Sequence, residues 1–435
     1  MPTEPRFRFF SSPFERTLAR GYRRLFSLGE IEESVLLQIA LGALLLSFFI
    51  GLSRWFYSES FSISAYLDNT YTCWPYFQTC GEWYFLQSLP FGYSQNIVFM
   101  AVFALMALAA YSMYRKRWAH AHAIMLALWT FKVTILFVLT QQLAANYDYY
   151  DTALLFVVLV LPHKLFFARL TFVLFYFLAA TIKIHEGWVL GSYFTSLATG
   201  LPIFGNSLAP IVTNLVIVMQ VVGSWLLFST RPSLRYVALG YFILFHLYSG
   251  VLVGFRYPTV ALVMLLVLFG IKWKETHVAV PLDRRSLAGW CFVAILFVLQ
   301  FIPISIPGDQ KLTLEGNYYG LFMFEANHQC VSRTVAHYDD GTSYEKVKQS
   351  ADAKWRCDVY EYWFAISNHC ARDAKTKRIE WTFDHSINGG PFYRIVDTQN
   401  ACELSYRPFV HNEWIRLPEN GAEIVGYALE NFYER

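Results

Sequence analysis

Long apolar runs dominate the first 305 residues of this chain and constrain its fold more than any other feature. Seven of them, at about 34–52, 96–114, 119–143, 168–184, 207–229, 255–272 and 287–305, are long enough to cross the ~30 Å hydrocarbon core of a bilayer. Two shorter runs, near 148–162 and 236–251, bring the expected number to about nine, although each could instead be a buried re-entrant segment. Only 15% of the residues are charged, against about a quarter in soluble chains. The sequence therefore predicts a polytopic all-α membrane bundle.

Positively charged residues fall in alternate connections between these runs. They are Arg6, Arg8, Arg16, Arg20, Arg23 and Arg24; Arg115, Lys116 and Arg117; Lys164 and Arg169; Arg231 and Arg235; and Lys272, Lys274, Arg284 and Arg285. Short basic connections stay on the cytoplasmic side of a membrane. We therefore expect a retained cytoplasmic segment over 1–33, a transmembrane domain over 34–305 and an exoplasmic domain over 306–435, in a bacterial inner membrane or the endoplasmic reticulum. The net charge of +3 and the absence of a basic face argue against nucleic acid as a partner.

Cysteine placement gives a separate indication of the same orientation. Six of the seven cysteines lie on the side assigned as exoplasmic, and the seventh, Cys291, falls within the last apolar run. Oxidising compartments permit disulfides and the cytosol does not. Cys73 and Cys80 lie in one aromatic loop without a nearby histidine, so a local disulfide is favoured over free thiols or a zinc site. For the other four, Cys330, Cys357, Cys370 and Cys402, three connectivities are possible and stay open. We expect no metal.

Lys183 is the most informative ionisable residue near the apolar runs. It stands close to the outer end of the run at 168–184, in FYFLAATIKIHEGWVLG. A lysine at such a place can be an anchor whose ammonium group reaches the headgroups. It can also be a desolvated amine, because burial disfavours the ammonium form and supplies a general base near neutral pH. Both interpretations are open from the residues alone.

Other polar residues are predicted at the same outer mouth of the bundle. His246 stands in the outward half of the run at 236–251, and His328 follows the last run. The turn QQLAANYDYYD, which leads into the run at 148–162, carries Asn146, Tyr147, Asp148 and Asp151. A lone histidine on an apolar helix is more often a packing residue with one hydrogen bond. Lys132 differs, because it falls within a helix and must face the bundle interior, where Gln141, Gln142 or an unidentified carboxylate could pair with it.

Several of these segments, taken in order, resemble one known family. The run around Lys183 resembles the segment that carries the catalytic base of vitamin K-dependent gamma-glutamyl carboxylases and of the wider HTTM membrane-domain family. The family's Asn-His turn resembles the segment NYDYYDTALL, in which Asn146 matches and Tyr147 stands in place of the histidine. FHLYSGVLVGFRYP matches His246 to the family's intramembrane histidine, and YYGLFMFEANH matches His328 to a lumenal one. IEWTFDHSINGGPFYRIVDTQNACEL resembles its Ser-aliphatic-Asn turn.

The resemblance spans about residues 35–410 and implies both a fold and an activity. The implied fold is a nine-helix bundle followed by a β-rich (α+β) lumenal domain, in a divergent member without the large distal lumenal domain. The implied activity is that of a lyase: Lys183 would deprotonate reduced vitamin K or another quinol, which reacts with oxygen and drives carboxylation of glutamates in a secreted peptide. His246, His328, Asn146 and Tyr147 would complete the catalytic site. Tyr147 departs from the family's histidine and so bears on whether carboxylation is retained.

Two further classes of function stay open beside this enzyme. One is a non-catalytic HTTM-type membrane protein that binds an exported peptide or helps it mature. The other is a small-molecule transporter, which would more naturally carry polar groups at the bilayer midplane, on broken helices in paired halves. The chain has no internal repeat and one midplane charge, Lys132, which disfavours transport.

The predicted orientation can be measured with a reporter. An alkaline phosphatase fused after Arg435 should be active in a bacterial host, because this enzyme folds only in an oxidising compartment. The matched control is a reporter that works only in the cytosol, fused at the same junction, which should be silent. High activity of the cytosolic reporter would overturn the whole topology.

Overall fold

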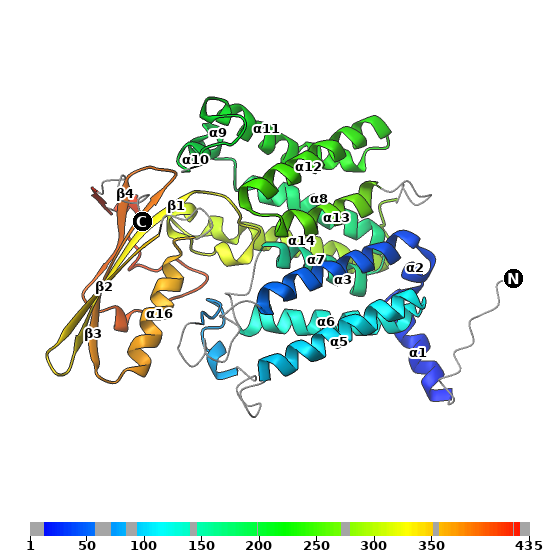
Figure 1. Ribbon diagram of the computed structural model, residues 1–435, viewed down its shortest axis with the longest axis horizontal. Coiled ribbons are helices and arrows are strands. Elements are labelled where there is room, and N and C mark those ends of the chain that lie inside the picture. The colour runs from blue at the N-terminus through cyan, green and yellow to red at the C-terminus, as the bar shows by residue number, and fades with distance from the viewer. Residues whose placement is uncertain are drawn as a thin grey trace.

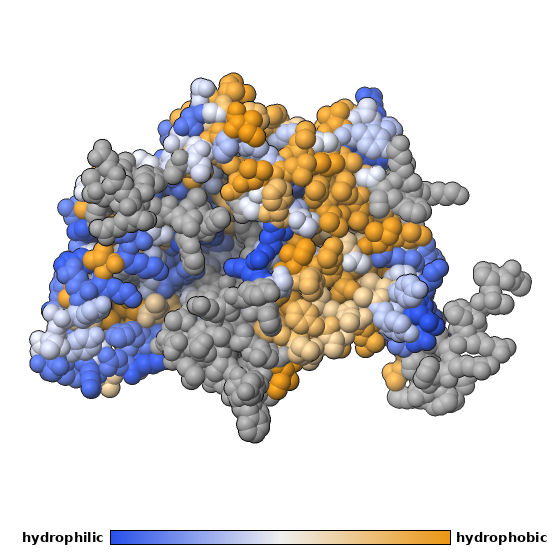
Figure 2. Space-filling view, in the orientation of Figure 1, coloured by the Kyte–Doolittle hydropathy of each residue, from blue (hydrophilic) through white to orange (hydrophobic). Residues whose placement is uncertain are grey.

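The structure is a computed structural model that describes residues 13–56, 71–83, 94–139, 146–197, 199–270, 279–350, 356–420 and 422–426. It has two parts, a bundle of helices and a sheet with one long helix beside it (Figure 1). Apolar side chains cover much of the bundle's visible face, whereas hydrophilic ones cover most of the sheet domain (Figure 2). This division agrees with a membrane domain followed by a domain in water.

In the part of the chain that the structure describes, six helices are long and apolar enough to cross a membrane. They are α3 (Val35–Phe56), α5 (Ser94–Tyr114), α6 (Trp118–Thr134), α8 (Lys164–Thr181), α12 (Pro232–Val253) and α14 (Leu287–Phe301), of which α6 and α14 are extended by short π or 3-10 turns. The other three expected runs form shorter helices, α7 (Asn146–Val160), α11 (Ala209–Val221) and α13 (Arg256–Leu265). The polytopic bundle is therefore confirmed, whereas nine membrane spans are not shown.

Helix α8 is the centre of this bundle. Of the residues in its apolar window 89% are buried, against 22% to 56% for the other five long helices. A helix that is apolar on every side can be buried on every side, and α8 reads KLFFARLTFVLFYFLAAT. Its last residue is Thr181, so the membrane-spanning segment ends before Lys183.

The N-terminal helices lie at one end of the bundle and the sheet lies at the other (Figure 1). Helix α1 (Pro13–Leu25) contacts α6 through Tyr22 and His122. In α2 (Leu28–Glu33) the Glu30 carboxylate accepts hydrogen bonds from the backbone N–H groups of His163 and Lys164, before and at the start of α8, at 2.9 and 2.7 Å. At the opposite end Tyr360 donates to the carbonyl of Cys73, at 2.9 Å. The segments expected on opposite sides of the membrane are thus at opposite ends of the bundle, while the charge pattern alone assigns the cytoplasmic side.

The C-terminal part is a five-stranded antiparallel sheet in the order β2-β1-β3-β4-β5. Its strands are β1 (His328–Tyr338), β2 (Ser343–Ser350), β3 (Thr376–Ile387), β4 (Phe392–Thr398) and β5 (Glu423–Val425). Helix α16 (Val359–Arg372) buries Tyr360, Trp363 and Phe364 against a core that includes Trp381 and Phe383 of β3. The β-rich α+β domain expected after the last apolar run is therefore present.

Three cysteine pairs lie at disulfide distance. Cys73 pairs with Cys80, as the sequence predicts. In the sheet domain Cys330 pairs with Cys357 and Cys370 with Cys402, which selects one of the three connectivities. The first of these two links the start of β1 to the segment before α16, and the second links the end of α16 to the segment after β4. Cys291 on α14 is exposed and unpaired among the described residues.

Candidate functional site

Lys183 is buried where the central helix ends. The chain turns after Thr181 and enters the short helix α9 (Glu186–Val189), and the Lys183 side chain folds back so that Nζ donates to the Ala179 carbonyl, at 2.5 Å. The amine also lies over the Trp188 ring, 5.4 Å from its centroid. Only 4% of Lys183 is exposed. A lysine that reaches the headgroups would expose its ammonium group, so this geometry fits the buried amine better.

The turn that carries Lys183 is attached to the segment leading into β1. His185 Nε2 donates to the Glu325 carbonyl, at 2.7 Å, because its Nδ1 already accepts from the Gly187 N–H. The indole N–H of Trp188 donates to the Phe324 carbonyl, also at 2.7 Å. The two parts of the molecule therefore meet at Lys183.

A second contact fixes the same junction. A side chain at Gly187 would place its Cβ 2.2 Å from Nδ2 of Asn388, so only glycine permits this approach. Asn388 ends the predicted Ser-aliphatic-Asn turn, and its Oδ1 accepts from the Asn327 N–H while its own N–H donates to the Asn327 carbonyl. The turn quoted from the sequence thus lies beside the Lys183 segment.

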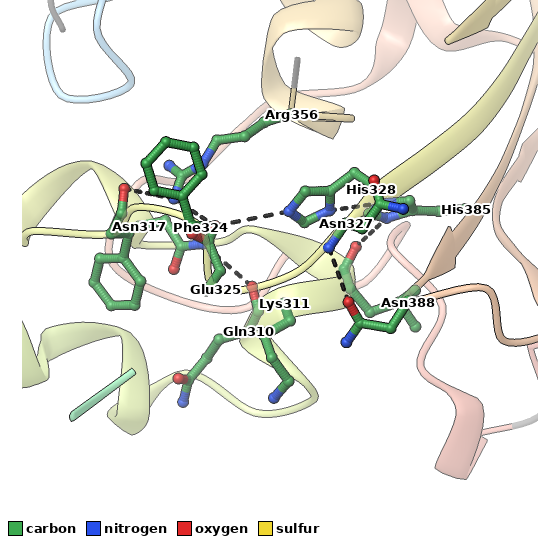
Figure 3. A network of polar contacts seen from close by, with 12 residues as sticks. Gln310, Lys311, Asn317, Phe324, Glu325, Asn327, His328, Arg356, His385 and Asn388 are labelled. Carbon is green, nitrogen blue, oxygen red and sulfur yellow. Dashed lines mark hydrogen bonds and ion pairs between the residues drawn. The ribbon is translucent and has the colours of Figure 1, made fainter. Parts of the chain in front are cut away.

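His328 lies in a line of polar side chains at this junction (Figure 3). Its Nδ1 is 3.1 Å from Nε2 of His385 on β3, and its Nε2 is 3.7 Å from Oε1 of Glu325. His385 Nδ1 in turn donates to the Leu312 carbonyl, at 2.6 Å. The Glu325 carboxylate forms an ion pair with Arg356. All of these residues except Arg356 are buried.

Burial and nearby charges have opposite effects on the pKa values of Lys183 and Glu325. Burial lowers the pKa of Lys183 to about 8, and the Glu325 carboxylate opposes this effect. Burial alone would raise the pKa of Glu325, but the Arg356 and His328 contacts lower it to about 2. Burial lowers the pKa of His385 to about 3. Glu325 is therefore ionised and His385 neutral at neutral pH, while the Lys183 amine is partly unprotonated.

His246 lies inside the bundle, away from this junction. Its Nε2 bonds the hydroxyl of Tyr176 on α8, at 2.6 Å, and its ring contacts that of Tyr257 on α13. His246 Nδ1 is buried and has no hydrogen-bond partner among the described residues. Tyr176 lies on α8, seven positions before Lys183, which stands in the turn after that helix.

The segment around Tyr147 differs from the predicted turn. Helix α7 begins at Asn146, so Tyr147, Asp148 and Asp151 stand in its first turns and not in a loop before it. The side chain of Asn146 lies outside the described part of the chain. Tyr147 is buried near Arg256, and its hydroxyl has no hydrogen-bond partner among the described residues. The structure therefore does not bring Tyr147 into contact with Lys183 through any described interaction.

Lys132 finds its partner in this same helix. Its Nζ lies 2.6 Å from Oδ2 of Asp151 and 3.0 Å from Oδ1 of Asp148, and all three side chains are buried. Gly51 of α3 gives the cluster room, because a Cβ there would lie 3.0 Å from Asp148 Oδ1. The carboxylate that the sequence left unidentified is thus supplied by two aspartates. This ion-paired cluster is a reason for the burial of Lys132 that needs no substrate.

The structure places the predicted residues in three groups. Lys183 and His328 both lie at the junction but share no described contact, whereas His246 lies with Tyr176 inside the bundle. Tyr147 lies near Arg256 and the Lys132 cluster. Sequence reasoning missed Glu325, whose place in the apolar run GLFMFEANH was an available signal. It also missed Arg356 and His385, which come from distant segments without a local pattern. Within the described residues no cluster of three or more His, Cys, Asp or Glu could hold a metal ion, so the metal-free site stays an expectation.

The Lys132 cluster predicts a stability effect. Lys132→Met leaves two buried carboxylates without their amine, and breaking a buried pair in this way costs about 3–5 kcal/mol. We expect a clear fall in the thermal unfolding temperature in detergent. Lys377→Met on the exposed part of β3 is the control and should change little. Adding Asp151→Asn to Lys132→Met should recover part of the loss; an unchanged unfolding temperature in Lys132→Met would contradict the buried cluster.

Comparison with known proteins finds no relative of this chain. No family model matches it, no curated protein is significantly similar in sequence, and no solved structure is significantly similar in fold. The likeness to the carboxylase and HTTM families therefore rests on the motifs in the sequence.

Proposed function

We propose that this chain is a membrane enzyme in which Lys183 acts as a general base on the hydroxyl of a lipid-soluble, quinol-type substrate. The observation that carries the proposal is the burial of the Lys183 amine at the junction, where its one described hydrogen bond goes to a backbone carbonyl. A carbonyl accepts from an amine as well as from an ammonium group. The amine can therefore lose its proton without leaving a buried partner unsatisfied.

The surroundings of Lys183 favour the neutral amine. Glu325, the carboxylate whose charge acts on Lys183, is already paired with Arg356. A carboxylate neutralised by a guanidinium attracts a second cation less, so burial dominates and the pKa of Lys183 falls to about 8. A base with a pKa near the working pH combines a large unprotonated fraction with useful basicity.

The place of the site suits a substrate from the bilayer. Lys183 follows the most buried helix and lies against the domain in water, so a quinol in the outer leaflet would meet it there. Deeper in the bundle, His246 Nδ1 is a buried polar atom without a partner among the described residues, and such an atom is commonly completed by a ligand or water. We assign His246 and Tyr176 to the apolar side of the same substrate site.

The resemblance supplies the remainder of the proposal. The oxygenated quinol would serve as the strong base that removes a proton from a glutamate of an exported peptide, with carboxylation following. The sheet domain, expected on the exoplasmic side, would present that peptide. A non-catalytic protein that binds an exported peptide, or a transporter, would not need a neutral Lys183.

The pair Lys183→Arg and Lys183→Ala tests the proposal. A guanidinium remains charged near neutral pH, so Arg should abolish quinol consumption as fully as Ala, by about 10²–10⁴-fold. If Lys183 only anchors the helix, Arg should serve almost as well. The measurement is quinol consumption in air by purified protein in lipid, compared at equal folded yield.

A second lysine provides the control for these variants. Lys311 lies near the same junction but is partly exposed and pairs with Asp309, so Lys311→Arg should keep normal consumption. Near-normal consumption in Lys183→Arg would refute the catalytic role. Wild-type protein that consumes no quinol would favour the non-catalytic alternative.

A further inference from the structure

The connection between helices α8 and α11 carries almost no charge. Residues 187–230 contain no Asp, Glu, Lys, Arg or His. The described part of this connection after the Lys183 turn, 186–197 and 199–208, forms α9, α10 (Ser192–Thr195), a loop at 199–205 and the 3-10 helix η6 (Asn206–Leu208). We call these residues the outer cap. Charged side chains are mostly found on surfaces that face water, so this composition does not suit a connection in water.

The outer cap exposes large apolar side chains. Ile203 is 85% exposed and Leu190 59%, and Phe204 and Leu208 are exposed as well. Figure 2 shows apolar side chains at the edge of the molecule where α9 and α11 lie in Figure 1. Ile203 also has a φ of 72°, in the left-handed region that strains a β-branched residue. Glycine or asparagine would relieve that strain at a loop tip in water, whereas this tip presents isoleucine.

A spanning helix sets the depth of the outer cap. The Tyr248 hydroxyl of α12 donates to the Pro202 carbonyl, at 2.6 Å, and the Tyr248 ring contacts that of Phe204, with 5.6 Å between the centroids. Tyr248 stands four residues before Leu252, the last residue of the apolar span, or about 6 Å along the helix. Side chains lean toward the N-terminus of their helix, which for Tyr248 is into the span. The loop at 199–205 therefore lies beside the outer part of the span.

The end of α12 that holds the loop is the one near the sheet domain. Leu252 of α12 and Phe324, which leads into β1, contact the same apolar cluster. Leu201 of the outer cap belongs to that cluster together with Trp188, whose ring lies over the Lys183 amine. The outer cap is thus on the same side of the bundle as the junction.

Neighbouring side chains satisfy backbone groups of the outer cap that water would satisfy in an ordinary loop. The Val189 carbonyl accepts from Nδ2 of Asn214 on α11, at 2.8 Å, and the Leu201 N–H donates to Oδ1 of Asn206, at 3.2 Å. The Pro202 carbonyl accepts from Tyr248, as described above. Irregular backbone at membrane depth requires this kind of internal partner, because hydrocarbon offers none.

We infer that the outer cap is inserted into the leaflet on the side of the sheet domain, with Ile203 at its tip among the lipid chains. The partner of this surface is the lipid itself. Three observations carry the inference: the lack of charge, the exposed apolar side chains, and the depth set by Tyr248. The inference does not depend on the proposed function. Its consequence is that the turn with Lys183 and Trp188 is held at the membrane surface.

A spin label attached at Ile203 tests the insertion. Cys291→Ser removes the free thiol of the described residues, and the other six cysteines form the three disulfides. Ile203→Cys in this full-length background then takes one nitroxide label, and the labelled protein is placed in lipid vesicles. Oxygen concentrates in the hydrocarbon, whereas a nickel chelate stays in water. We expect the label at Ile203 to collide with oxygen several-fold more than with the chelate.

Two control sites have nearly the same exposure but known surroundings. Leu244→Cys lies on the spanning part of α12, where the side chain is 68% exposed, and should give the oxygen-dominated signal of a lipid-facing site. Ile424→Cys lies on β5 of the sheet domain, where the side chain is 64% exposed, and should give the chelate-dominated signal of a site in water. Leu190→Cys is a second outer-cap site, expected to resemble Leu244→Cys, and serves if Ile203→Cys does not fold.

Two results would contradict the insertion. A chelate-dominated label at Ile203 or Leu190, like that at Ile424, would show that the outer cap lies in water. A label shielded from both oxygen and the chelate would show that a second copy of the chain covers this surface in place of lipid. Either result would overturn the inference and leave the proposed role of Lys183 to its own test.

Discussion

Two backbone carbonyl groups, those of Phe324 and Glu325, join the helical bundle to the sheet domain at the place where Lys183 is buried. They accept from Trp188 and His185, which follow Lys183 on the same turn. Both hydrogen bonds are partly buried, and breaking one would leave a partly buried polar group unsatisfied, at a cost of up to about 1–3 kcal/mol. The contact therefore fixes the distance between Lys183 and the domain that supplies Glu325, His328 and His385.

Much of the fold could be predicted from the apolar runs and the positions of the cysteines. The six long helices coincide with predicted runs, and the sheet domain follows the last of them, because a bilayer demands about 20 apolar residues for each spanning helix. The disulfide between Cys73 and Cys80 was predicted correctly, because both cysteines lie in one loop on the side assigned as exoplasmic. The pairings Cys330–Cys357 and Cys370–Cys402 could not be predicted, because they depend on the sheet register, which brings distant segments together. Helix α7 starts earlier than expected, since the pairing of Asp148 and Asp151 with Lys132 lets charged residues enter a buried helix.

The candidate site was predictable only in part. Lys183 and His328 are close to the same junction, and both carried a local signal in the sequence. His246 was expected beside Lys183 but contacts Tyr176 deeper in the bundle, because its place on α12 is set by helix packing that a single sequence does not reveal. Arg356 and His385 lie on segments far from His328 in the chain and reach it through tertiary folding alone. Asn146 and Tyr147 remain predictions, and Tyr147 is instead beside Arg256.

The ionisation of the Lys183 side chain is the most direct test of the account. Protein labelled with ¹⁵N-lysine and held in lipid can be titrated by solid-state nuclear magnetic resonance, which separates amine from ammonium nitrogen. Lys183→Arg assigns the signal by removing it. The account predicts that the Lys183 signal changes to that of a neutral amine as the pH rises through about 8, well before the exposed lysines. A Lys183 signal that remains an ammonium group up to the range of exposed lysines would contradict it.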